Sequence, residues 1–198
     1  ILAGVLIVLT GCGGSSSSLA PTTQTGVFLD SPVINVGYRT ETLEGVTNSL
    51  GEYEYIEGET VTFFIGDLEF PPVTATGTVT PLELAGTQDT NNSEVVNIIR
   101  LLQTLDQDGD PDNGITITDT AKSSATQVDF GLSEADFAAS TAVDALITNA
   151  GQDTAVTELV STSDAIAHFE QELDDNGIAF GSVVGTWINT STDNDFLM

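Results

Sequence analysis

The chain has 198 residues, of which 30 are acidic and three are Lys or Arg, so its formal net charge at pH 7 is -27. This charge excludes nucleic acid as a partner, because phosphate groups are bound by Lys and Arg, and it argues against docking to anionic lipid head groups. Hydrophobic residues make up 40% of the chain and are patterned, so we expect a folded protein rather than a disordered one.

The single cysteine, Cys12, excludes an intramolecular disulfide and a cysteine-rich zinc site. It follows the apolar run Ile1–Leu9, which suits a signal peptide and is too short to span a bilayer. Leu9-Thr10-Gly11-Cys12 resembles the lipobox of bacterial lipoproteins. The resemblance implies that a signal peptidase cuts before Cys12 and that its thiol carries a lipid. The alternative is a small buried free cysteine.

We therefore expect residues 1–11 to be a signal peptide that is truncated at its start. Residues 12–25, rich in Gly and Ser, are expected to be a lipid anchor and a flexible linker. Gly13 rather than Asp follows the cysteine, and the sorting rule of the resembled class then implies an outer-membrane lipoprotein, periplasmic or surface-exposed. The membrane is the expected partner, reached through Cys12.

Short alternating segments follow and predict strands. Tyr53 and Tyr55 alternate with glutamates, which gives one aromatic and one charged face, and Thr60–Gly66 has the strongest strand pattern. Turn residues such as Pro71-Pro72 separate the segments, and Thr76–Leu82 is expected to add a last strand. We predict a small antiparallel β-sandwich over residues 26–85, as the first part of an α+β fold.

Four stretches of this segment carry a resemblance: Gly26–Val33, Gly45–Thr47, Gly51–Tyr55 and Gly58–Gly66. They resemble a module that recurs in bacterial surface lipoproteins and adhesin-like proteins. Such modules are similar to prealbumin-like or carboxypeptidase-regulatory-like β-sandwiches. The resemblance implies a spacer or a binding unit, with no catalytic residue among the matching positions.

The hydrophobic period changes after residue 86 and predicts a helical subdomain over residues 86–177. One helix is expected to begin at the N-cap candidates Asn91-Asn92-Ser93 and to end near Leu105. A second is expected to run from Ser133 to about Asn149, and a third from about Ser161 to Asn176. About three amphipathic helices are expected to pack against the sandwich, since each alone is marginal. Residues 178–198 are predicted to start a further β domain that is truncated. The alternative is a strand that completes the first domain.

An aspartate-rich loop follows the first predicted helix. Asp106, Asp108, Asp110 and Asp112 alternate with Gly, Pro and Gln in this loop. Calcium takes six to eight oxygen ligands, which tight loops of alternating carboxylates and carbonyls supply. The sequence therefore predicts a calcium site, and the alternative is a solvated acidic turn.

Two registers fit the predicted calcium loop. In the first, the ligands begin with Asp106, Asp108 and Asp110. In the second, Asp108, Asp110 and Asp112 lead and Asp119 takes the closing acidic position. The second register resembles an EF-hand loop, and the extra aspartate also resembles thrombospondin-type-3 or dockerin-like loops. The short side chain of Asp119 is a departure from the EF-hand pattern and would weaken bidentate closure.

Few residues point to catalysis. His168 is the only histidine, and a lone histidine on a helix is expected to be a surface or half-buried residue. Tyr38, Tyr53, Tyr55 and Trp187 are candidates for stacking on sugars, but we expect the three tyrosines to be core or half-buried strand residues. Arg100 is expected either to pair with a carboxylate near the aspartate loop or to lie exposed. We therefore predict no catalytic residue and a protein that is not an enzyme.

These observations lead to three alternative functions. The first is a non-enzymatic, calcium-stabilised cell-envelope lipoprotein that acts as a structural or spacer module. The second is an adhesin module that binds a carbohydrate or a protein. The third is the accessory N-terminal region of a secreted hydrolase.

Overall fold

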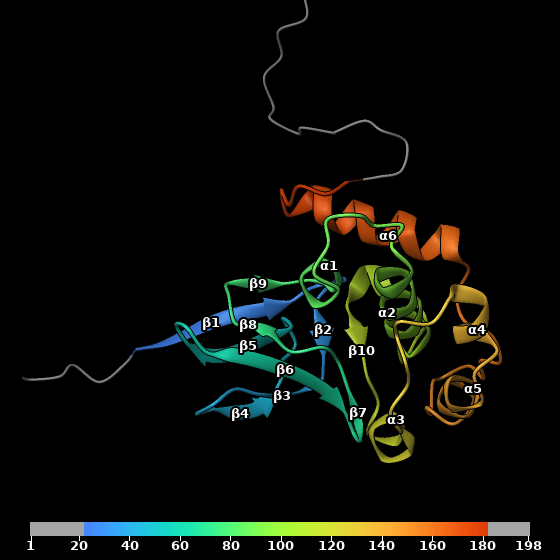
Figure 1. The fold of residues 1–198 in the computed structure, drawn as a ribbon. Coiled ribbons are helices and arrows are strands. Elements are labelled where there is room, and N and C mark those ends of the chain that lie inside the picture. The colour runs from blue at the N-terminus through green and yellow to red at the C-terminus, as the bar shows by residue number, and fades with distance from the viewer. Residues whose placement is uncertain (1–21, 182–198) are drawn as a thin grey trace, which may run out of the picture.

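The computed structural model describes residues 22–181, and these form an α+β fold with antiparallel sheets, as predicted (Figure 1). The strands are β1 (Thr23–Phe28), β2 (Val33–Ile34), β3 (Gly37–Arg39), β4 (Glu44–Val46), β5 (Glu52–Ile56), β6 (Thr60–Ile65), β7 (Leu68–Glu69), β8 (Val73–Thr74), β9 (Thr78–Val79) and β10 (Ile115–Thr116). The helices are α1 (Pro81–Leu84), α2 (Ser93–Thr104), the 3-10 turn η1 (Pro111–Asn113), α3 (Asp119–Ser124), α4 (Glu134–Ala138), α5 (Thr141–Thr148) and α6 (Thr162–Asp175). Among these helices, none has the length and apolar character needed to cross a membrane.

Residues 22–181 contain three sheets, and two of them form the sandwich. One has the order β5-β1-β9, and the other has the order β4-β3-β6-β7 with β8 also paired to β6. Most pairs are antiparallel, but β9 runs parallel to β1, with Val27 opposite Thr78. Phe28 of the first sheet stacks on Phe63 of the second with 4.2 Å between ring centroids, and both side chains are fully buried. An aromatic core therefore joins the two sheets.

The strands show the predicted alternation of buried and exposed side chains. Tyr53 and Tyr55 of β5 are buried, while Glu54 between them is exposed. Tyr53 donates from its hydroxyl to the carbonyl of Thr76 at 2.6 Å, and burial raises the pKa of Tyr53 to about 12. Together with Tyr38, these tyrosines belong to the core, so they are not platforms for sugar stacking. Trp187 lies outside the described residues.

Helices α2 and α6 begin and end where the sequence predicted. Asn92 caps the start of α2, Leu105 is its C-cap, and Ser161 caps the start of α6. The single helix expected from Ser133 to Asn149 is instead two helices, α4 and α5. Ser140 has the extended angle ψ 128 and serves as the N-cap of α5, which interrupts the helical hydrogen bonding there.

Two short helices were absent from the prediction. Residues 80–84 form a capping box followed by α1, so the strand expected over Thr76–Leu82 ends at Val79. The signal was present in the sequence, because Thr80, Pro81 and Glu83 have the spacing of a capping box with Pro at the first helical position. Thr118 likewise caps α3 by accepting from the backbone of Ala121.

One core continues from the sheets into the helices. Buried side chains of β1, β5 and β6 belong to the same cluster as those of α2, β10, α4 and α5. β10 also pairs with β2, with Ile115 opposite Val33, so the chain that leaves the aspartate loop joins the sandwich. A second cluster packs α6 on α1 and α2. The helical part thus packs against the sandwich, as predicted, and shares its core.

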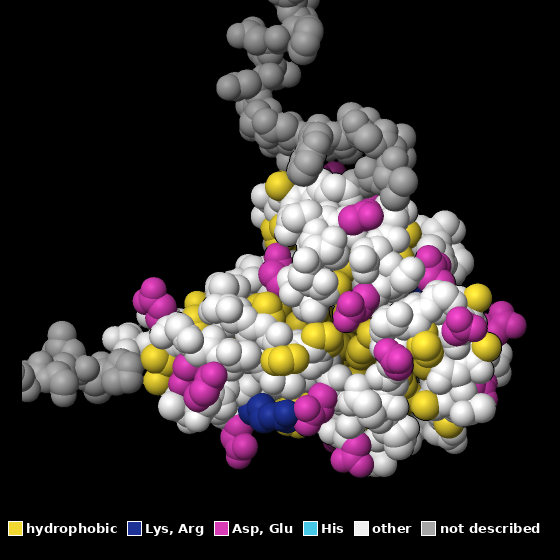
Figure 2. All heavy atoms as spheres, viewed as in Figure 1, with side chains coloured by type: hydrophobic (Ala, Val, Ile, Leu, Met, Phe, Trp, Pro, Cys, Tyr) yellow, Lys and Arg dark blue, Asp and Glu magenta, His cyan; other side chains and the backbone are white. Residues whose placement is uncertain are grey.

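The predicted further β domain, residues 178–198, falls almost wholly outside the described residues. Phe180 is buried in the cluster around α6, and Gly181 forms a parallel bridge with Asp89. The signal peptide of residues 1–11 and the lipid anchor Cys12 also lie outside the described part of the chain. Acidic side chains are spread over the face seen in Figure 2 rather than gathered in one place.

Candidate functional site

The aspartate loop is closed by hydrogen bonds at its base. α2 ends at Thr104, and two residues later Asp106 forms an isolated bridge with Ile117. The backbone of Gln107 donates to the carbonyl of Thr116 at 3.0 Å. Gly109 has φ 77, a conformation that glycine adopts without strain and that lets the loop turn back. The loop is therefore a closed unit held between α2 and β10.

Asp106 is the buried acid of this loop. Asp106 is 2% exposed, and its Oδ1 accepts a hydrogen bond from the backbone N–H of Thr116 at 2.8 Å. Its Oδ2 is buried and receives no hydrogen bond from the described residues. Burial, and then the neighbouring Asp108 carboxylate, raise the pKa of Asp106. A buried carboxylate oxygen without a donor is costly, so this position favours a proton or a cation.

Asp108 has the opposite electrostatic character. Its Oδ2 accepts from the Asn113 side chain at 3.0 Å and its Oδ1 accepts from the backbone of Asp110 at 3.0 Å. The Asn113 bond is the largest cause of a lowered pKa at Asp108. Asp108 is thus held ionised beside Asp106, within hydrogen-bonding reach of it. Two carboxylates within hydrogen-bonding reach of each other repel unless a proton or a cation lies between them.

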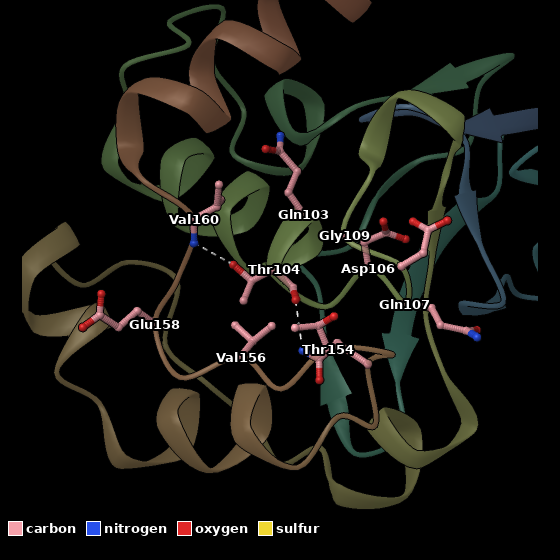
Figure 3. A pocket seen from close by; sticks show the side chains of 11 residues that line it. Gln103, Thr104, Asp106, Gln107, Gly109, Thr154, Val156, Glu158 and Val160 are labelled. Atoms are coloured by element: carbon pink, nitrogen blue, oxygen red, sulfur yellow. Dashed lines mark hydrogen bonds between the residues drawn. The ribbon is translucent and has the colours of Figure 1, made fainter.

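A pocket of about 220 Å³ opens at this pair of acids (Figure 3). The end of α2, the aspartate loop and the segment between α5 and α6 line it. The Thr104 side chain accepts from the backbone of Val160 at 2.9 Å, and the Gln152 side chain donates to the Thr104 carbonyl at 3.0 Å. The lining residues include no Lys or Arg, so the pocket favours a cation over an anion.

The other predicted ligands have different surroundings. Asp110 is exposed. Asp112 contacts His168, with Oδ1 3.2 Å from Nδ1. Asp119 accepts from Asn35 at 3.1 Å and pairs with Lys122 at 3.0 Å.

The predicted ligands therefore do not form one cluster. Within residues 22–181, no group of three or more His, Cys, Asp or Glu side chains is arranged to hold a metal ion. The structure brings together Asp106 and Asp108, which lead the first register. It places Asp119, the closing residue of the second register, at the first position of α3.

His168 takes part in a hydrogen-bonded chain that the sequence did not reveal. Its Nε2 lies 3.2 Å from the Ser31 hydroxyl, and its Nδ1 contacts Asp112. Ser31 follows the end of β1 and has φ 56, which is unusual for a residue other than glycine. The order Ser, His, Asp is that of a catalytic triad.

The burial of this chain differs from that of a working triad. Ser31 is 1% exposed, whereas the Asp112 side chain is 86% exposed. A nucleophile must be reached by substrate, and the orienting acid of a triad is buried. The chain therefore links the sandwich, α6 and the aspartate loop, and its geometry favours a structural role.

Arg100 follows neither of the two expectations. It is half-buried, and its Nε donates to the carbonyl of Val160 at 2.8 Å instead of pairing with a carboxylate near the loop. Burial lowers the pKa of Arg100.

Comparisons with protein-family models, with curated proteins and with solved structures find no match for this chain.

Proposed function

We propose that the chain is a non-enzymatic cell-envelope lipoprotein whose aspartate loop is a calcium clip. The observation that carries the proposal is the buried, donorless Oδ2 of Asp106 beside the ionised Asp108. Both carboxylates are hard oxygen ligands of the kind that calcium prefers. A divalent cation between them would replace their repulsion by attraction.

The surroundings favour the register led by Asp106. Asp110 is exposed and free to turn toward the pair, while Asp119 already has Asn35 and Lys122 as partners. Two or three carboxylates leave several coordination positions, and loop carbonyls and water fill such positions in calcium sites. We therefore assign Asp106, Asp108 and Asp110 as the ligands, with Asp112 outside the shell.

The clip would act on the fold as a whole. The loop joins the end of α2 to β10, and β10 pairs with β2 of the sandwich. Calcium bound only in the folded state would stabilise that connection by about 2.7 kcal/mol at a concentration one hundred times its Kd. It would also reduce the self-repulsion of a chain with net charge -27.

The envelope location rests on the segment before the fold. The proposed anchor is a lipid on Cys12, and the Gly/Ser-rich residues that follow would hold the folded part away from the membrane. In this arrangement the protein is an outer-membrane spacer or structural module. Its membrane contact is through the lipid.

Calcium titration of the full chain by isothermal calorimetry tests the clip. We expect saturable binding of one calcium ion, with magnesium bound more weakly because it needs six ligands in a tighter octahedron. Asp106→Asn and Asp108→Asn should each abolish binding, and Glu57→Gln, the same charge change in an exposed turn, should leave it unchanged. Equal binding by Asp106→Asn and the unsubstituted chain would contradict the proposal.

A further inference from the structure

Arg100 is set apart from the other two cations of the chain. Arg39 pairs with Glu69 at 2.7 Å, and Lys122 pairs with Asp119 at 3.0 Å. Arg100 makes no ion pair with any residue between 22 and 181, although the chain has 30 acidic residues. A half-buried guanidinium without an ion pair is costly, since burial removes its water and the nearby charge of Glu134 offsets this only in part.

The guanidinium of Arg100 is nonetheless held in place. Its Nε donates to the Val160 carbonyl at 2.8 Å. The backbone N–H of Val160 donates to the Thr104 hydroxyl at 2.9 Å, and that hydroxyl donates to the Arg100 carbonyl at 2.5 Å. This closed set of bonds uses one of the five N–H donors of the guanidinium. The two terminal NH2 groups remain as a planar fork, which matches a carboxylate.

A hollow of about 310 Å³ lies against Arg100, a volume at the lower end of the range for small-molecule sites. Its lining combines one arginine, two acidic residues, one threonine and three apolar residues. The members are Arg100, Asp144, Glu158, Ala138, Ile147, Leu159 and Thr157. Glu158 lines both this hollow and the pocket beside Asp106, so the two are neighbours. Figure 3 shows the Glu158 side chain pointing away from Asp106.

We propose that this hollow binds a small zwitterion, an aliphatic α-amino acid, with its carboxylate on the Arg100 fork. Its ammonium group would lie toward Asp144 and Glu158, which are exposed and have no cationic partner among residues 22–181. Its side chain would pack on Ile147, which is buried, and on Leu159, which is half-buried.

The net charge of the protein selects the zwitterion over simpler ligands. A field from -27 charges repels a free anion, and Glu134 adds a further negative charge near Arg100. A simple amine is attracted by the acids but is repelled by the guanidinium. A zwitterion has no net charge and satisfies both signs at once, so it is the class that the hollow fits best.

The probe is L-leucine, titrated into the full chain by isothermal calorimetry in excess chelator so that calcium plays no part. We expect saturable binding at one site. Isovalerate, which lacks the ammonium group, and isoamylamine, which lacks the carboxylate, should each bind at least about tenfold more weakly. No saturable leucine binding, or equal binding of leucine and isoamylamine, would overturn the proposal.

Matched variants test which residues hold the ligand. Arg100→Gln should weaken leucine binding at least about tenfold, while Arg39→Gln, which removes a cation elsewhere, should not change it. The double variant Asp144→Asn with Glu158→Gln changes only exposed side chains, so we expect it to fold. It tests the binding site even if Arg100→Gln does not fold. It should weaken leucine binding and strengthen isovalerate binding, and unchanged affinities for both ligands would contradict the assignment.

Discussion

The side chain of Gln103 on α2 donates to both carboxylate oxygens of Asp30, at 3.1 Å and 3.3 Å. Asp30 follows β1 and is fully buried, and the same amide group also donates to the carbonyl of Ala165 on α6 at 3.2 Å. Gln103 therefore joins the end of a sandwich strand to two helices. Burial, only partly offset by this bond, holds the pKa of Asp30 well above its usual range.

This buried acid makes stability depend on pH. A carboxyl whose pKa is raised in the folded state binds its proton more tightly there than in the unfolded state. Its penalty is therefore absent at pH values below the unfolded pKa and grows as the pH rises toward the folded pKa. Asp30→Asn should remove this penalty and raise the free energy of unfolding at pH 7 by roughly 1–3 kcal/mol. The gain should be much smaller at a pH below the ordinary carboxyl range.

Urea unfolding of the two proteins across this pH range provides the measurement. Asp67→Asn is the control, because it makes the same chemical change at an exposed position. Its effect should be within about 0.5 kcal/mol at every pH. If Asp30→Asn were as neutral as Asp67→Asn, the buried carboxyl would carry no penalty.

His168 connects three parts of the fold through Ser31 and Asp112. His168→Ala should lower the free energy of unfolding by roughly 1–3 kcal/mol, since it removes two hydrogen bonds and leaves the buried Ser31 hydroxyl without its partner. Asp112→Asn should cost less, because Asp112 is exposed. Urea unfolding measures both variants, and a larger loss for Asp112→Asn would contradict this order.

The same chain of residues predicts an absence of serine-hydrolase chemistry. Ser31 is 1% exposed, so a fluorophosphonate probe should not label the folded protein. Mass spectrometry of the treated protein gives the readout. Labelling at Ser31 that disappears in His168→Ala would show that the triad order is catalytic and that the non-enzymatic proposal is wrong.

Gly66 marks a close contact between the sandwich and α3. It has φ 55, and a Cβ placed there would collide with the carbonyl oxygen of Lys122. Gly66→Ala should therefore lower the free energy of unfolding by about 2 kcal/mol or more, through backbone strain and overpacking. Gly77→Ala, where a Cβ would meet nothing within 4 Å, is the matched control. Equal thermal shifts for the two variants would contradict a tight junction.

The proposed anchor makes a prediction about the membrane. Cys12→Ser removes the thiol that would carry the lipid, so the full-length precursor expressed in a bacterial envelope should no longer remain with the membrane fraction. Fractionation followed by detection of the folded part measures this. Retention equal to that of the unsubstituted chain would count against the lipoprotein proposal.

Local patterns in the sequence were sufficient to predict the longer strands and helices. The alternation around Tyr53 and the caps at Asn92 and Ser161 correspond to the strand and helices found there. The break at Ser140 was missed because the hydrophobic period continues across it. A helix end there depends on the backbone of one residue, which periodicity does not report.

The candidate site was predictable only in part. The spacing of the aspartates identified the loop, but it did not show that Asp106 alone is buried or that Asp119 pairs with Lys122. The contacts of Ser31 with His168 and of Asp30 with Gln103 join residues far apart in the chain, so no local pattern encodes them. The same holds for the hollow at Arg100, which the segment between α5 and α6 completes.

Thermal unfolding of the full chain with calcium and with chelator tests the calcium clip most directly. We predict that calcium raises the Tm by several degrees and that Asp106→Asn removes this shift. In chelator, Asp106→Asn should have a higher Tm than the unsubstituted chain, because the substitution also removes the penalty of the buried carboxylate. Glu57→Gln should keep the shift seen in the unsubstituted chain. A Tm that is the same with calcium and with chelator would contradict the account.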